Sequence, residues 1–251
     1  MNAVVDLIMS HRSIRSFRNE PLTEEQIETI VRCAQSASSS NFMQAYSIIG
    51  VTDPAKKAKL AEISGGSFVE TCGHLFLFCA DLHRLKLACQ MENADLDDVL
   101  ESTERFMVAV ADCSLAAQNA AIAAESMGLG ICYVGGIRND VRKVCEILNL
   151  PDFVFPLYGL AVGYPAEEPE LKPRLPLGAV YFENEYLNDE KKFRNMLEQY
   201  NQEIRKYYRK RTGGKEEDSW TERMVKTLSR RARMDMKART REKGFCLDSC
   251  D

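Results

Sequence analysis

The sequence predicts a three-layer domain of the α+β or α/β class, in which helices cover a small sheet. Segments with helical periodicity alternate with a few short apolar runs that are typical of buried strands. The chain has 251 residues, of which 45% are hydrophobic and 28% are charged, so its composition is that of an ordinary globular protein and excludes a collagen-like chain. At roughly 100–200 residues per domain, this length allows one or two domains.

The first part of the chain contains well-marked element boundaries. Thr23 and Gln26 form a capping-box pattern at the start of a helix whose apolar residues follow the 3.6-residue spacing. Asp53-Pro54 closes one strand, and Gly65-Gly66 ends the helix that follows it. In order, we expect a helix over 4–10, a helix over 24–37, a strand over 46–51, a helix over 55–63 and a strand over 74–80.

The middle of the chain predicts the centre of the fold. Residues 92–111 read as helical, and an Ala-rich helix over 112–127 is apolar nearly all round, which places it in the core or at a subunit contact. Gly128 and Gly130 stop this helix. A strand over 131–134, a helix over 141–148 and a strand over 155–162 follow.

The pattern at the end of the chain predicts a helical extension that packs outside the core domain. Residues 165–178 form a proline-rich connector, and helices are expected over 189–209 and, as one basic helix, over 219–243. We therefore divide the chain into a core, residues 1–180, and a C-terminal helical extension, residues 181–251.

The charge is distributed unevenly. Residues 201–251 hold 15 Lys and Arg against 9 Asp and Glu, whereas residues 1–200 hold 18 against 28. The acidic body argues against general nucleic-acid binding. One alternative treats the basic end as a nucleic-acid or partner-binding arm on an inactive fold, although it lacks the interleaved aromatic residues of a single-strand binder.

The sequence indicates a cytoplasmic protein. No signal peptide is expected, because the N-terminus lacks a basic region and His11-Arg12 interrupts the apolar run. No run of ~18 uncharged apolar residues exists, so no membrane-spanning helix is expected. The nine cysteines include no CxxC pair and mostly lie in apolar runs, which favours reduced, buried thiols. Only Cys246 and Cys250 look exposed, and a disulfide or metal site there stays open.

Four short segments carry side chains or backbone suited to binding an anion or a flat ring. These are His11-Arg12-Ser13-Ile14-Arg15, Ser38-Ser39-Ser40-Asn41, Tyr133-Val134-Gly135-Gly136 and Lys172-Pro173-Arg174-Leu175-Pro176. Arginine forks suit phosphate, paired glycines let backbone approach a ligand, and alternating prolines hold two cations on one side of an extended segment. Taken singly, each also reads as an ordinary basic turn, polar loop, tight turn or charged linker.

Catalytic side chains are harder to find. His11, His74 and His83 are the histidines, and His74, at the start of a strand, reads as a hydrogen-bonded core residue. No metal-ligand pattern, nucleophile motif, dinucleotide fingerprint or P-loop is present. An anion-binding set without acid–base machinery predicts that a cofactor carries the chemistry.

Four segments together resemble the nitroreductase superfamily, and in particular its NADPH-dependent, oxygen-insensitive nitroreductases and flavin reductases. They are HRSIRSF, SSSNFMQ, AQNAAIAAESMGLGICYVGGIRND and LKPRLP, which occur in the family's order from about residue 1 to residue 245. The resemblance implies an α+β sandwich with a central, mostly antiparallel sheet flanked by helices. It also implies an intertwined homodimer whose C-terminal segments embrace the neighbour, with FMN bound in clefts at the interface.

The resemblance carries residue roles onto this sequence. It assigns Arg15 to the pyrimidine edge of the flavin, where it tunes the hydride chemistry, so no residue of the chain is expected to be catalytic itself. Ser67 stands where the branch carries a Gln, and we expect the contact from Ser67 in its place. The full set expected to bind FMN is His11, Arg12, Ser13, Arg15, Ser39, Ser67, Tyr133, Val134, Gly135, Gly136, Lys172 and Arg174.

The same resemblance implies the co-substrate and the reaction. NADPH reduces FMN, and a small acceptor, such as a nitroaromatic, a quinone or free flavin, then takes two electrons in a ping-pong sequence. Arg211 and Lys215 are expected at NADPH, and Asn41, Phe42 and Arg233 at the acceptor. Glu216 stands where the family has a second arginine, which predicts a weaker preference for NADPH over NADH. An FMN storage or transfer protein is the remaining alternative.

Overall fold

The computed structural model describes residues 2–248, so Cys250 and its suggested partnership with Cys246 lie outside the described residues. The chain divides into two compact units. The first comprises the chain up to Pro169 together with the segment from Arg233 onward, and the second comprises Glu170–Ala232. Each unit is described by itself.

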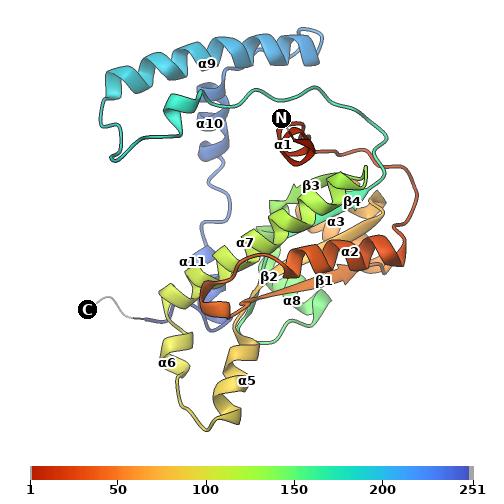
Figure 1. Cartoon of the computed structure of the whole chain (residues 1–251), viewed down its shortest axis with the longest axis vertical. Coiled ribbons are helices and arrows are strands. Elements are labelled where there is room, and N and C mark those ends of the chain that lie inside the picture. Colours follow the sequence, from red (N-terminus) through yellow and green to blue (C-terminus); the bar gives the residue numbers. More distant parts are fainter. Residues whose placement is uncertain (1, 249–251) are drawn as a thin grey trace. The chain divides into compact units, whose positions relative to one another are not determined.

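The first unit is built on an antiparallel sheet (Figure 1). Within residues 2–248 its strands are β1 (Tyr46–Val51), β2 (His74–Asp81), β3 (Gly130–Val134) and β4 (Val154–Gly163), in the spatial order β1-β2-β4-β3. All three pairings are antiparallel, with Ile48 opposite Phe78 and Tyr133 opposite Leu160. The predicted strands and the α+β class are therefore confirmed.

Helices cover both faces of the sheet, which is why all eight residues of β2 are buried. Successive side chains of a strand point to opposite faces. Phe76 and Phe78 pack in one core with α2 (Glu24–Gln35) and α7 (Thr103–Ser126). Leu75 and Leu77 pack in a second core with α3 (Pro54–Ser64), α4 (Phe68–Thr71) and α8 (Val141–Leu148). A strand that is covered on both faces does not alternate apolar and polar residues, and the run Leu75–Ala80 of β2 is accordingly apolar throughout.

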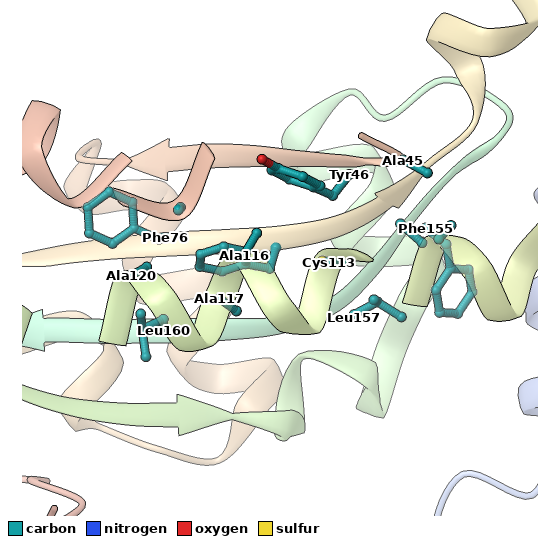
Figure 2. Packing of buried hydrophobic residues seen from close by; sticks show 14 of the residues in the cluster. Ala45, Tyr46, Phe76, Cys113, Ala116, Ala117, Ala120, Phe155, Leu157 and Leu160 are labelled. Carbon is teal, nitrogen blue, oxygen red and sulfur yellow. The ribbon is translucent and has the colours of Figure 1, made fainter. Parts of the chain in front are cut away.

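Helix α7 is the central helix of the first core. Ala116, Ala117 and Ala120 are completely buried, and Figure 2 shows them against the strands that carry Phe76 and Leu160. Their small side chains let the helix lie close to the sheet. The helix is long and apolar enough to cross a membrane by composition alone, but it is a buried core helix that carries Asp112 in its buried face.

The expected helix boundaries hold where a capping signal is present. The Thr23–Gln26 capping box begins α2, and Gly65, with φ of 70°, ends α3. Asn149 takes the same left-handed conformation at the end of α8, with φ of 52°. The short helix α1 (Ala3–Met9) begins at Asn2, whose side chain accepts a hydrogen bond from Val5 N.

The prediction of one helix over 92–111 is wrong. Helix α5 (His83–Met91) comes first, then α6 (Asp97–Leu100), and α7 begins at Thr103. Asn93 has φ of 55°, which ends the first helix, and Ser102 caps the start of α7 by accepting from Arg105 N. Consequently the Ala-rich helix begins nine residues before Asp112, the start that the sequence suggested.

The prediction of one basic helix over 219–243 is also wrong. Helix α10 (Trp220–Ser229) and α11 (Met236–Glu242) are separated by a break in which Arg231 and Arg233 have φ of 48° and 60°. Like charges on adjacent turns destabilise a helix, and Arg230, Arg231 and Arg233 crowd this stretch. The break divides the two units, because α10 belongs to the second and α11 to the first.

The second unit contains the proline-rich connector from Glu170, the short turn η3 (Leu177–Ala179), α9 (Glu190–Arg211) and α10. Asp189 caps α9 by accepting from Lys192 N. Tyr200, Ile204 and Tyr207 form the buried face of α9, close to the apolar face that the sequence predicted.

Two expectations about single residues need correction. His74 is a core residue with 5% of its surface exposed, but its Nε2 atom has no hydrogen-bond partner, so it is not satisfied as expected. Cys246 is only partly exposed to solvent, and Cys33 and Cys89 are partly exposed as well. The other described cysteines are buried, as predicted, and the described residues contain no cluster of three His, Cys, Asp or Glu placed to hold a metal.

Candidate functional site

The segment over residues 11–18 runs as an extended chain beside the sheet. Ile14 N donates to Ile131 O of β3 at 2.9 Å, and Arg18 N donates to Tyr164 O at 2.8 Å. Because side chains alternate along extended backbone, the segment separates its cations. Arg12 and Arg18 line one hollow, whereas Arg15 lines another.

The Arg12 hollow is an open groove of about 700 Å³. Carboxylates surround it: Glu168 lies 4.0 Å from the Arg12 guanidinium, and Glu125 binds His11 Nδ1 at 2.6 Å. The Arg12 Nε atom is nevertheless buried without a hydrogen-bond partner. Since a buried donor is costly to leave unpaired, this atom fits a site that receives an acceptor group from a ligand.

The Arg15 hollow brings together two of the predicted cofactor residues. Arg15 and Ser67 both line it, with Lys57 and Phe17, around a volume of about 770 Å³. Arg15 N donates to the Glu167 carboxylate at 2.8 Å, which fixes the backbone. Burial raises the pKa of the Cys132 thiol, and the nearby positive charge of Arg15 opposes that rise, so this charge lies near β3.

The end of β3 presents backbone rather than side chains. Val134 is 5% exposed and its side chain packs in the second core, so only its backbone is free to meet a ligand. Tyr133 is 37% exposed and lies edge-on to Tyr158 at 5.5 Å between ring centroids. Burial raises the pKa of Tyr133, which keeps its hydroxyl neutral.

Two arginines converge on Gly135. Arg233 Nη1 donates to Gly135 O at 2.8 Å, and Arg138 donates to Leu157 O beside it. The pKa of Arg138 is lowered, first by burial and second by the neighbouring Arg233 charge. The left-handed backbone at Arg233 therefore delivers its guanidinium to the predicted flavin strip.

The loop that follows α2 has an unusual backbone. Asn41, Phe42 and Gln44 have φ of 48°, 60° and 51°, and the Phe42 side chain is 83% exposed. The completely buried carboxylate of Asp112 accepts hydrogen bonds from Ser40 N at 2.8 Å and Ala45 N at 3.1 Å. Asp112 thus holds both ends of the loop.

The free-energy cost of the left-handed residues in this loop and the stabilisation by Asp112 are of similar size. A non-glycine residue in the left-handed region costs about 1–2 kcal/mol, and a hydrogen bond to a charged group contributes about 1.5–3 kcal/mol. The two bonds to Asp112 therefore offset most of the cost of the three left-handed residues. Strain that is maintained in this way is concentrated at functional sites.

This loop does not share a hollow with the other predicted residues of the first unit. Ser39, Asn41 and Phe42 are not among the residues that line either the Arg12 or the Arg15 hollow. Ser39 Oγ accepts instead from Gln44 N at 3.3 Å, inside the loop. These three residues therefore lie outside the linings of both hollows of the first unit.

In the second unit, the connector brings its two predicted cations together. Lys172 and Arg174 line one hollow of about 280 Å³, with Tyr200, Tyr208 and Arg223. The Lys172 Nζ atom lies 5.5 Å from the centroid of the Tyr208 ring, and Tyr200 donates to Pro173 O at 2.9 Å. The alternation of Lys, Pro and Arg places both cations on one side, as predicted.

The turn between α9 and α10 carries the predicted nicotinamide residues. Arg211 Nη1 donates to the Tyr207 hydroxyl at 3.0 Å. Glu216, the departure from the family pattern, lies 2.5 Å from Arg223 Nη2, and the Arg223 guanidinium stacks on Tyr208 at 3.4 Å from the ring centroid. The neighbouring acids Glu217, Asp218 and Glu222 are paired with Arg209, Lys226 and Arg205.

Three residues of these sites were not found by sequence reasoning. Asp112 is a carboxylate in an otherwise apolar stretch, which is a usable signal of a buried acceptor. Arg138 lies two residues after the Gly135-Gly136 pair, but its contact with Leu157 depends on the folded arrangement. Arg223 lies in a basic stretch and has no local pattern that singles it out.

Comparisons with known proteins agree with this architecture. Residues 8–164 match the nitroreductase family, and residues 172–248 match the nitroreductase family C-terminal domain. The chain is 49% identical over 246 residues to FMN reductase (NADPH) of Bacillus subtilis (strain 168), covering 98% of this chain and 99% of that protein. It is 44% identical over 243 residues to a Cr(VI) reductase of Pseudomonas sp. (strain G-1), covering 96% and 98%.

A solved structure is similar over the same length. NfrA1 of B. megaterium superimposes with a TM-score of 0.96 at 52% sequence identity, covering 98% of this chain and 100% of that one. Both the sequence and the fold of the described residues therefore agree, and the chain belongs to the nitroreductase family.

Proposed function

We propose that this protein is an FMN-containing oxidoreductase that transfers two electrons from NADPH to small acceptors such as nitroaromatics, quinones or free flavin. The observation that carries the proposal is the near-full-length similarity to FMN reductase (NADPH), which includes both family segments. The segments that suggested the family also supply the groups that such a reaction needs.

The first unit offers groups that fit FMN. Arg12 has a buried Nε atom without a partner, which suits a phosphate oxygen. Val134, Gly135 and Gly136 offer backbone at the end of β3, which suits the face of a flat ring. With Arg15, we assign His11, Ser13, Ser39, Ser67 and Tyr133 to the same cofactor, and Lys172 and Arg174 from the second unit as its further cations.

Bound FMN supplies the atom that accepts hydride and later passes on the electron pair. The chain's part is electrostatic and positional. Arg15 holds a fixed positive charge where two-electron reduction leaves negative charge, at the pyrimidine edge, and such preorganised charge is most effective in a cleft of low dielectric. By favouring transfer of a pair, Arg15 disfavours single-electron transfer.

NADPH and the acceptor use one pocket in turn, which makes the reaction ping-pong. We assign Arg211 and Lys215 to the NADPH phosphate, because an arginine fork and a lysine suit that anion. We assign Asn41, Phe42 and Arg233 to the acceptor side. The exposure of Phe42 and the contact of Arg233 with Gly135 support this assignment.

We propose a homodimer as the working form, with residues 181–251 embracing the neighbouring subunit and contributing to the NADPH site. Ser39 and Phe42 are not among the residues that line the Arg15 hollow, which supports a site that a second copy completes. Exposed apolar side chains support this, since large apolar patches mark interfaces. They include Val4, Ile8 and Met9 of α1 and Met107 and Leu115 of α7.

We propose that the enzyme works in the cytoplasm, and the free thiols of the described residues and the burial of α7 in the core agree with this.

Purification tests the proposed function directly. We expect a yellow protein whose colour is bleached by NADPH and returns on adding a quinone. A colourless protein that cannot be reconstituted with FMN contradicts the proposal, and a yellow protein that is inert to both nicotinamides indicates FMN storage.

A further inference from the structure

The loop over Ser40–Ala45 is strained, exposed and held from the inside of the molecule. Asn41 and Phe42, which lie in the short turn η1 (Ser40–Phe42), and Gln44 after it are left-handed, and 83% of the Phe42 surface is exposed. Exposing a large apolar side chain to water is unfavourable, and the left-handed backbone conformation is sterically crowded for any residue with a β-carbon. The loop therefore adopts this shape because something else fixes it.

The fixing group is the carboxylate of Asp112. It is completely buried in α7, and its two oxygens accept from the first and last amides of the loop, Ser40 N at 2.8 Å and Ala45 N at 3.1 Å. One carboxylate oxygen accepts from Ser40 N and the other accepts from Ala45 N, so a single side chain fixes the distance between the two ends of the loop. Helix α7 is itself packed across the sheet, which makes it a rigid support.

A second side chain, Arg84, holds the segment that leaves the loop. Arg84 donates to Gln44 O at 2.9 Å and to Ser47 Oγ at 2.9 Å. These bonds fix the exit of the loop but reach none of its turn residues. The turn over Ser40–Phe42 is closed locally by the bond from Met43 N to Ser40 O at 3.0 Å, and the bond from Ser40 N to Asp112 ties this turn to α7.

We propose that Asp112 is a positioning residue that holds the Ser40–Ala45 loop in the conformation that presents Phe42 to the electron acceptor. This rests on the proposed function, which assigns Asn41 and Phe42 to the acceptor. Asp112 itself is enclosed in the core and touches neither acceptor nor cofactor. Its contribution is to place the loop accurately, because small displacements of a contact residue cost large factors in rate.

The test uses the full-length protein loaded with FMN and the variant Asp112→Asn. Asparagine keeps the shape but has one acceptor oxygen, so one of the two amides then faces an NH₂ group. Hydrogen exchange measured by mass spectrometry should show faster exchange in the peptide over 38–47 and unchanged exchange in β2. With menadione as acceptor, we expect kcat/KM to fall roughly 10-fold, mainly through KM.

A double-mutant cycle separates positioning from a general structural role. If Asp112 acts by placing Phe42, then Asp112→Asn should cost little further activity in a Phe42→Ala background. Independent, multiplying losses in the double variant overturn the proposal, as does unchanged exchange over 38–47 in Asp112→Asn. A protein that never oxidises NADPH, but whose loop exchange is still accelerated by Asp112→Asn, refutes the proposed function and leaves the loop anchor in place.

A second pair of variants covers the case in which Asp112→Asn does not fold. Ser39 has extended backbone and Ser40 begins a turn, which are conditions that suit a proline at residue 40. Ser40→Pro removes the N–H that reaches Asp112 together with the serine hydroxyl. Ser40→Pro should accelerate exchange in the loop, while the matched control Ser40→Ala, which keeps the N–H, should not. Equal exchange in the two variants overturns the anchoring role.

Discussion

The backbone of Gly136 lies directly against the backbone of Ser64. A β-carbon added at Gly136 would lie 2.3 Å from the Ser64 carbonyl oxygen and 2.9 Å from its Cα. The contact ties the end of β3 to the end of α3, on the side of the sheet that holds the second core. The two segments meet so closely that only glycine fits at residue 136.

Gly136→Ala is therefore expected to destabilise the protein by about 1–3 kcal/mol, the usual cost of overpacking. It should also weaken FMN binding, because the neighbouring backbone must move. Gly135→Ala is the matched control, since its β-carbon meets only arginine side-chain ends at 3.5 Å and 3.8 Å. Urea unfolding compares the stability of the two variants, FMN titration measures binding in Gly136→Ala against the parent protein, and equal stability of both variants would contradict the steric argument.

Arg15→Ala tests the electrostatic role at the flavin. Without the guanidinium we expect the rate of flavin reduction by NADPH to fall roughly tenfold or more, and the two-electron potential to become more negative. Stopped-flow absorbance and a redox titration measure the two quantities. Arg15→Lys should recover part of the loss, and Arg32→Ala, which removes an exposed cation paired with Glu28, serves as the control. If neither quantity changes in Arg15→Ala, the role is wrong.

The parts of the fold that sequence reasoning recovered are those with local signals. The Thr23–Gln26 box, the Gly65 terminus and the apolar runs over 46–51 and 74–80 are properties of a few adjacent residues. The helix breaks at Asn93 and Arg231–Arg233 had no proline or glycine to mark them. Asn93 ends its helix with local bonds, from Asn93 N to Gln90 O and from Ala94 N to Cys89 O. Arg233, by contrast, is held by a tertiary contact with Gly135.

The candidate site also contains residues that local motifs predicted and residues that only the folded structure brings together. Arg15 with Ser67, and Lys172 with Arg174, are brought together as the motifs suggested. The anchor at Asp112 and the pairing of Glu216 with Arg223 join residues that are distant in sequence or lie outside any motif. Burial of a single carboxylate and the choice of ion-pair partner are decided by the folded arrangement.

The Glu216–Arg223 pair leads to a different prediction from the sequence, which is that Glu216 does not weaken the proposed preference for NADPH over NADH. Because Arg223 neutralises Glu216 at 2.5 Å, the carboxylate does not repel a phosphate near Arg211 and Lys215. Arg223→Gln should release that charge and lower kcat/KM for NADPH by about 3–10-fold, a modest factor because the pair is partly exposed. The value for NADH, which lacks the phosphate, should change little.

The matched comparison adds Glu216→Gln to Arg223→Gln, which should restore the NADPH value by removing the free carboxylate. Arg205→Gln breaks the similar pair with Glu222 and should leave the ratio of NADPH to NADH unchanged. Parallel losses with both nicotinamides in Arg223→Gln would show that the pair supports the structure rather than phosphate recognition.

His74 predicts a loss of stability at acidic pH. Burial, and secondarily the positive charge of Lys57, lowers the pKa of His74 from 6.5 to about 4. Its ring lies 4.3 Å from the ring of Phe76, and its Nε2 atom has no partner to share a proton. The unfolded chain therefore binds a proton at a higher pH than the folded chain does. The stability due to neutral His74 is complete above pH 6.5 and is lost as the pH falls toward 4.

At pH 4.5 this difference amounts to roughly 2–3 kcal/mol of unfolding free energy. We expect His74→Gln, which does not titrate, to lose that much less stability than the parent protein between pH 7 and 4.5, even if it is less stable at pH 7. Urea unfolding at several pH values measures the slope. Equal slopes in the parent and His74→Gln would mean that His74 accepts its proton as readily in the folded chain as in the unfolded one.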